Sequence, residues 1–139
     1  MEIQYQVISE KKLLIQRYIG VYSLEHYCTY MNDLIKKDEW KCVQKVLTDL
    51  REVNLEHAFE NLTKLIDFRD KVVIKKYRNV FLVDNPFSTA TVHLYQNELN
   101  NKEYDYKYCS TIEKAIQLLK LNESEKEFEF KLRNLENQF

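Results

Sequence analysis

The chain has 139 residues, of which 45% are hydrophobic and 13% aromatic, and its 21 basic and 22 acidic side chains leave a formal net charge of -1. A chain of this length and apolar content is expected to fold as one domain around one hydrophobic core. Its near-zero charge provides no overall field that would attract a phosphate backbone or an anionic membrane surface, so no nucleic-acid partner is expected.

Cysteine and glycine usage excludes several kinds of site. Cys28, Cys42 and Cys109 lie far apart and form no C-x-x-C pair, so neither a disulfide framework nor a metal site is predicted. A single glycine excludes every Gly-rich phosphate loop, and no cofactor is predicted. The first residues lack a basic segment followed by an apolar one, and no apolar run approaches the roughly 20 residues of a membrane span. We therefore expect a cytoplasmic protein with reduced thiols and no membrane span.

The first part of the chain predicts a β-hairpin followed by a helix and a strand. Residues 3–8 alternate between apolar and polar, and residues 13–22 are rich in β-branched and aromatic side chains, so both segments are expected to be strands. Ser23 is placed to cap a helix over residues 24–35, whose apolar side chains recur at helical spacing. Residues 43–50 supply a third strand, which starts a βαβ rhythm.

The middle of the chain continues this rhythm. Asn54 can cap a helix that extends to about Asp70. Residues 80–83 form a continuous apolar run, which is typical of an inner parallel strand buried on both faces. Asn85 followed by Pro86 indicates the start of the next helix, since Pro is favoured at the first helical position.

The last elements before the tail are a strand and a helix. Residues 104–109 alternate as a strand, and residues 110–113 read as a capping box with Ser110 as the cap. The predicted fold class is therefore α/β, with a mixed five-stranded sheet in the order β-β-α-β-α-β-α-β-α and helices packed on the sheet.

The last 18 residues, 122–139, are expected to form an amphipathic helical extension to a domain that covers residues 1–121. If this extension is helical, one apolar stripe lies along it and must be buried against some surface. It can pack on its own domain, join a second subunit in a homodimer, or stay frayed. The stripe consists of Phe128, Leu132, Leu135 and Phe139.

The segments 46–54 and 80–86 each combine a buried strand with an acidic residue and a helix cap at its end. Together with the order of elements, they resemble the STAS domain and the SpoIIAA-like group, which is itself similar to a wider group of lipid-binding domains. The resemblance implies a protein-binding, regulatory module. In the bacterial anti-sigma-factor antagonists of this family, a phosphorylated Ser at the start of the second helix acts as the switch. The matching stretch here, residues 54–58, contains no Ser or Thr, so this switch is not expected.

Ligands of an open α/β sheet bind beyond the carboxyl ends of the parallel strands, where loops and helix N-termini converge. The polar residues expected at that rim could bind a polar ligand or a basic side chain of a partner. The alternative is structural: the two aspartates accept backbone N–H groups of the following loops, and the arginine pairs with one of them. These residues are Asp49, Arg51, Asn54, His57, Asp84 and Asn85, with Ser110 beside them.

Other polar and aromatic clusters are weaker candidates. His57 or Cys109 could serve a hydrolase, but no nucleophile stands in an elbow-like setting near a base. The basic residues between 69 and 78 are interpreted as a solvated helix face. The alternating tyrosines of residues 104–108 are interpreted as one face of an edge strand that the tail covers.

The favoured hypothesis is a non-enzymatic regulatory or protein-interaction module of STAS-like type with an unknown protein partner. The alternative is a carrier or sensor of a small apolar or amphipathic ligand, such as a lipid-like molecule, because the predicted interior is rich in aromatic side chains. A cavity between the sheet and the helices would favour the second hypothesis.

Overall fold

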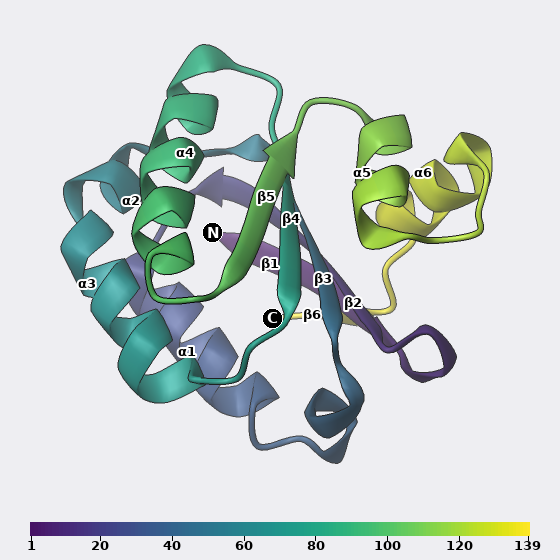
Figure 1. The fold of residues 1–139 in the computed structure, drawn as a ribbon, viewed down its shortest axis with the longest axis horizontal. Helices are drawn as coiled ribbons and strands as arrows, with labels where there is room; N and C mark the ends of the chain where they lie inside the picture. Colours follow the sequence, from purple (N-terminus) through teal and green to yellow (C-terminus); the bar gives the residue numbers. More distant parts are fainter.

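The computed structural model describes all 139 residues, and its strands form one mixed, six-stranded sheet (Figure 1). In chain order the strands are β1 (Glu2–Ile8), β2 (Leu13–Val21), β3 (Lys45–Asn54), β4 (Arg78–Leu82), β5 (Asp105–Cys109) and β6 (Asn137–Gln138). They lie side by side in the order β5-β4-β3-β2-β1-β6. β2 to β5 are parallel to one another, whereas β1 is antiparallel to both of its neighbours. The predicted α/β class with a mixed sheet is confirmed.

Helices cover both faces of this sheet (Figure 1). One face carries α1 (Leu24–Leu34), α2 (Glu56–Glu60), α3 (Leu62–Phe68) and α4 (Pro86–Asn100), and the other carries α5 (Ile112–Leu119) and α6 (Glu125–Arg133). Two short 3₁₀ turns (Ser9–Lys11 and Asp38–Cys42) and one π-helical turn (Arg69–Val73) complete the regular structure.

Two of the four predicted helix caps are confirmed, those at Ser23 and Asn85. Asn54 is one residue too early, since the cap position of α2 is Leu55. Ser23 Oγ accepts the backbone N–H of His26 at 3.2 Å, and Asn85 Oδ1 accepts that of Ser88 at 2.9 Å. Ser110 was the wrong cap for α5, because the hydroxyl of Thr111 accepts the N–H of the residue three positions later. A local capping pattern therefore located these helices to within one residue.

The single helix predicted from residue 55 to about 70 is wrong, because the segment is divided into α2, α3 and the π-helical turn. Asn61 separates the two helices with backbone angles outside the helical region, and its side chain donates to the carbonyl of His57 at 2.7 Å. This side-chain bond competes with helical backbone pairing. The π-helical turn ends at Val73, and the φ of 26° at the next residue, Ile74, is unusual for a β-branched residue.

Two hydrophobic clusters lie on opposite faces of the sheet. The larger one, between the sheet and α1 to α4, takes Val46, Leu50 and Phe81 from β3 and β4. The smaller one, beneath α5 and α6, takes Leu47 and Val80 from the same two strands. Because these strands have apolar partners on both faces, the prediction of a buried inner strand at residues 80–83 is confirmed for β4.

The tail adds a sixth strand, so the predicted number of five strands was one too few. Its helix α6 ends at Arg133, and β6 pairs with β1, where the backbones of Ile3 and Phe139 exchange two hydrogen bonds of 3.1 and 2.7 Å. A strand of two residues carries no usable periodicity, which is why the sequence indicated a continuous helix here.

The apolar stripe of the C-terminal extension is buried within the chain itself. Phe128 and Leu132 are buried in the smaller cluster, and Leu135 packs against it. Phe139 lies on the other face, with its ring centroid 5.3 Å from that of His26 and 5.5 Å from that of Tyr30. The structure therefore shows the alternative in which the extension packs on its own domain.

Candidate functional site

The six polar residues predicted to form one rim do not form one site. Asp49 and Arg51 belong to the face of the sheet that α6 covers, where Arg51 also lies 3.7 Å from Glu129. Asp49 is only 2% exposed and accepts the Arg51 Nε and Nη2 groups at 3.0 and 2.9 Å and the Arg51 backbone N–H at 3.1 Å. Asp49 and Arg51 therefore have the structural role that was the alternative to a binding site: the aspartate accepts a backbone N–H and pairs with the arginine.

The other predicted residues are exposed. Asp84 and Asn85, together with Ser110, border an open groove beside α4 that also contains His93 and Tyr108. Asn85 already serves as the cap of α4. Asn54 Oδ1 accepts the N–H of Glu56 at 2.9 Å, and His57 is exposed one residue further along. This rim is therefore an open surface and not an enclosed site.

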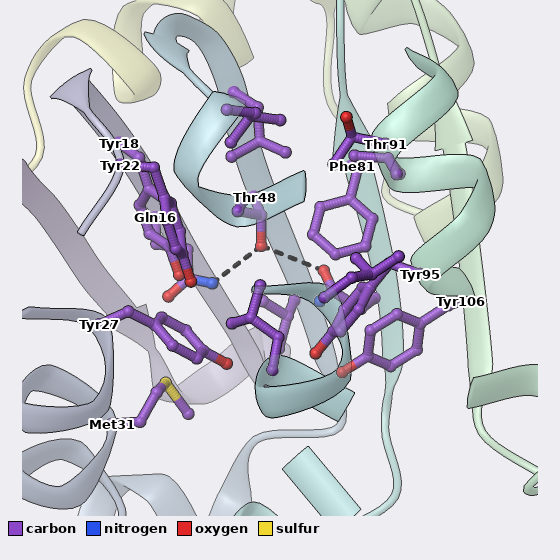
Figure 2. A pocket seen from close by; sticks show the side chains of 18 of the residues that line it. Gln16, Tyr18, Tyr22, Tyr27, Met31, Thr48, Phe81, Thr91, Tyr95 and Tyr106 are labelled. Carbon is purple, nitrogen blue, oxygen red and sulfur yellow. Dashed lines mark hydrogen bonds between the residues drawn. The ribbon is translucent and has the colours of Figure 1, made fainter. Parts of the chain in front are cut away.

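An enclosed site lies instead between the sheet and the helices α1 to α4. It is a cavity of about 60 Å³ that is lined by 20 residues, 16 of them hydrophobic (Figure 2). Leu62 of α3 and Tyr95 of α4 are the half-buried members of this lining. We refer to it as the tyrosine cavity, because its lining includes Tyr18, Tyr22, Tyr27, Tyr77, Tyr95 and Tyr106.

A row of hydrogen-bonded polar side chains crosses the floor of the tyrosine cavity on three adjacent strands (Figure 2). Gln16 Nε2 on β2 donates to Thr48 Oγ1 on β3 at 2.8 Å, and that hydroxyl donates to Asn79 Oδ1 on β4 at 3.2 Å. Tyr30 of α1 donates to Gln16 Oε1 at 2.9 Å. Since buried polar groups are retained where their hydrogen bonds are satisfied, this row places oriented polar groups in an otherwise apolar chamber.

The tyrosine hydroxyls are divided between two environments. The chain has ten tyrosines, and the hydroxyls of Tyr5, Tyr30, Tyr104, Tyr106 and Tyr108 take part in hydrogen bonds within the protein. The hydroxyls of Tyr27 and Tyr95 lie near each other and can interact, as can those of Tyr77 and Tyr106. The other five tyrosines all line the cavity: Tyr18, Tyr22, Tyr27, Tyr77 and Tyr95.

Burial keeps these hydroxyls protonated. It raises the pKa of Tyr18, Tyr27 and Tyr95, because the negative phenolate is poorly solvated inside the protein. At neutral pH the lining therefore presents protonated phenols, whose O–H groups can donate hydrogen bonds. A buried hydroxyl without a partner is unfavourable, so such a chamber favours water or a ligand that accepts hydrogen bonds.

Arg69 lies directly behind this lining and is fully buried, with 0% exposure. Its Nε donates to the Tyr106 hydroxyl at 2.5 Å and its Nη2 to the Lys75 carbonyl at 2.6 Å. The guanidinium carbon lies 4.6 Å from the ring centroid of Tyr77 and 4.3 Å from that of Tyr104. Nη1 has no partner, and no carboxylate lies within ion-pair distance of Arg69.

The side chain of Arg69 is nevertheless charged. Burial disfavours the cation, but the hydrogen bond to the Tyr106 hydroxyl and the faces of the Tyr77 and Tyr104 rings favour it, and the pKa of Arg69 is raised overall. The sequence had placed Arg69 on a solvated basic face, and this interpretation is wrong. Periodicity did not predict the burial, since the residue belongs to the π-helical turn and not to a regular helix.

The groups considered for catalysis or metal binding are not brought together. Burial raises the pKa of the Cys109 thiol, which disfavours the nucleophilic thiolate. No group of three or more His, Cys, Asp or Glu side chains is placed where it could hold a metal ion. None of the helices has the length and apolar character needed to cross a membrane.

Comparison with models of known protein families gives no match for this chain, and comparison with curated proteins gives none either. The functional interpretation therefore rests on the chemistry of the tyrosine cavity and of the molecular surface.

Proposed function

We propose that the chain is a non-enzymatic binding domain, a carrier or sensor, that takes a small amphipathic molecule into the tyrosine cavity. The observation that carries this proposal is the composition of the lining, in which 16 of 20 residues are hydrophobic and a short polar row crosses the floor. Binding sites for small molecules characteristically combine a mainly apolar wall with a few placed polar groups that orient the ligand.

The size of the cavity limits what fits without movement. A cavity of roughly 150 Å³ binds benzene, so about 60 Å³ admits a few waters or a ligand of only a few heavy atoms. A larger ligand requires the wall formed by α2 and α3 to move outward. These are the shortest helices of the fold, with five and seven residues, and they are interrupted at Asn61. We therefore expect the cavity to enlarge by outward movement of α2 and α3.

Native mass spectrometry of the gently purified 16.9 kDa chain tests the proposal, with a bound small molecule as the expected result. Ala58→Leu adds three carbon atoms at a buried position of the lining and should remove the extra mass. Ala90→Leu makes the same change at an exposed position of α4 outside the cavity and should leave it unchanged. Equal occupancy in both variants would place the ligand elsewhere and refute the proposal.

A second candidate function, a regulatory protein-interaction module of STAS-like type, is favoured by an exposed aromatic pair. Phe59 of α2 and Phe87 of α4 are 48% and 46% exposed, and their ring centroids are 5.8 Å apart. Both helices follow the carboxyl ends of neighbouring parallel strands, and the sequential strand order supports the resemblance to STAS domains. Exposed aromatic side chains are the usual anchors of protein interfaces.

Affinity capture tests this second candidate with matched surface substitutions. If the aromatic pair is an interface, Phe59→Ser and Phe87→Ser should each reduce capture of a specific partner. Phe130→Ser is the control, since Phe130 is 69% exposed on α6, over the opposite face of the sheet. Losing the partner with the control variant as well would show that the effect is not specific to the aromatic pair.

A further inference from the structure

The tyrosine cavity has an uncompensated positive charge beside it. None of its 20 lining residues is charged, and Tyr77 and Tyr106 of this lining are in direct contact with Arg69. The acidic residue next to Arg69 in sequence, Asp70, is engaged on the outer side, where its carboxylate lies 3.4 Å from Lys102 Nζ and accepts the Tyr104 hydroxyl at 3.3 Å. A buried charge that lacks a counter-ion is costly, so the site is electrostatically incomplete.

Tyr106 lies between Arg69 and the cavity, since it contacts Arg69 and lines the cavity. Its hydroxyl oxygen accepts the Arg69 Nε–H, so the hydroxyl proton remains free to be donated. Accepting a charge-assisted hydrogen bond polarises the hydroxyl and makes it a stronger donor. Figure 2 shows the hydroxyls of Tyr27, Tyr95 and Tyr106 directed toward the same part of the cavity, and the Tyr95 and Tyr106 ring centroids are 5.8 Å apart.

Hydroxyl groups that converge near a positive charge favour the binding of a negatively charged hydrogen-bond acceptor. A carboxylate is such a group, because it accepts up to four hydrogen bonds and donates none. A cationic ligand would be repelled by Arg69 and would find no carboxylate in the lining. A neutral ligand would leave the charge of Arg69 uncompensated.

This inference rests on the function proposed above. We propose that the ligand of the tyrosine cavity is a small organic anion that consists of a carboxylate attached to an apolar body. Its carboxylate accepts hydrogen bonds from the hydroxyls of Tyr27, Tyr95 and Tyr106, with the cation of Arg69 behind them. Its apolar body lies against the aliphatic and aromatic wall formed by residues such as Leu65 and Phe81.

Two pairs of probes of matched shape test the sign of the ligand charge: isobutyrate against isobutyramide, and benzoate against benzamide. Each is titrated into the full-length chain and followed by NMR chemical shifts, with the side-chain Nε–H of Arg69 as a local reporter. Each carboxylate is expected to bind at least about tenfold more tightly than its amide and to shift the Arg69 signal, since hydrogen bonds to charged groups are the stronger ones.

Two substitutions locate the effect. Tyr106→Phe keeps the ring and removes the hydroxyl, and Arg69→Gln removes the charge; each should reduce the preference for carboxylate over amide to less than about threefold. Tyr108→Phe is the control, since Tyr108 belongs to the open groove and not to the cavity, and it should retain the full preference. If Arg69→Gln does not give a dispersed, folded NMR spectrum, Tyr106→Phe decides alone.

The outcomes separate this inference from the function on which it rests. If acid and amide bind equally to the unmodified chain, and Ala58→Leu abolishes the binding of both, the cavity binds ligands but the anionic preference is refuted. If a folded Tyr106→Phe protein keeps the full preference, the inference is also overturned. If no probe binds at all, the inference fails, and the native mass spectra of the unmodified chain and of Ala58→Leu decide the proposed function.

Discussion

At the scale of single residues, the two most buried charged side chains, Asp49 and Arg69, have different kinds of partner. Asp49 accepts two hydrogen bonds from the guanidinium of Arg51 and a third from the Arg51 backbone N–H. Arg69 has only phenol and carbonyl oxygens as partners, and one of its nitrogens has none. The first arrangement is complete within the chain, whereas the second lacks a carboxylate.

The completeness of the first pair predicts a structural role for Asp49. Asp49→Ala should lower the free energy of unfolding by about 2 to 4 kcal/mol, because it leaves the partly buried Arg51 without its acceptor. Asp84→Ala, at an exposed position, should change it by less than about 0.5 kcal/mol. Urea unfolding of both variants checks this expectation. Equal stability of the two variants would mean that the Asp49 pair contributes nothing net.

At the scale of elements, features that depend on local chemistry were predictable and features that depend on tertiary contacts were not. The caps at Ser23 and Asn85 follow from residues within one helical turn, and they were located correctly. The break at Asn61 and the burial of Arg69 depend on side-chain bonds and packing that no periodic pattern contains. Asp49 and Arg51 were predicted to share a rim with Asp84, but strand pleating directs the first two residues toward α6.

The tyrosine cavity could not be predicted from the sequence for a related reason. Its lining comes from β2 to β5 and from α1 to α4, so no segment of the chain contains more than a few of its residues. In sequence, Tyr27 and Tyr95 are part of ordinary apolar helix stripes. One signal was present in the composition, since ten tyrosines against seven phenylalanines predict an unusually hydroxyl-rich core. Composition alone does not say which hydroxyls lack partners.

The link between the β1–β2 turn and the tail is expected to be sensitive to acid. Glu123, between α5 and α6, lies 2.5 Å from Lys11 Nζ and also pairs with Lys131, and its side chain is nearly inaccessible. Burial tends to raise the pKa of this carboxyl, but the two lysines outweigh that effect and lower it from its ordinary value of 4.5. Ionised Glu123 therefore stabilises the fold above about pH 4.5, and this contribution is lost as the pH falls through the lowered pKa.

Thermal unfolding from pH 7 to pH 3 measures this contribution. Glu123→Gln should lower the melting temperature at neutral pH, and its difference from the unmodified chain should shrink as the pH falls below 4.5. Glu127→Gln, at an exposed position of α6, serves as the control. A difference that stays constant across the range would show that the loss comes from packing and not from charge.

At the scale of the whole molecule, part of each edge of the sheet has hydrogen-bond partners. At the β5 edge, the carboxamide of Asn100 accepts the backbone N–H of Tyr106 at 2.9 Å and donates to its carbonyl at 3.1 Å, as a neighbouring strand would. At the other edge, β6 pairs with β1. The tail was expected to cover β5, and this prediction is wrong, since it covers β1. Uncovered edges are the usual sites of unwanted pairing between chains.

This arrangement predicts what removal of the tail strand will do. Deleting residues 135–139 exposes the outer edge of β1 and uncovers Tyr30, so the shortened chain should be less stable and should self-associate as its concentration rises. Phe139→Ala keeps the backbone pairing and loses only the ring, so it should lower stability without self-association. Sedimentation velocity at several concentrations distinguishes the two effects. A change from a dimer in the full-length protein to a monomer in the shortened one would instead mean that the tail joins subunits in solution.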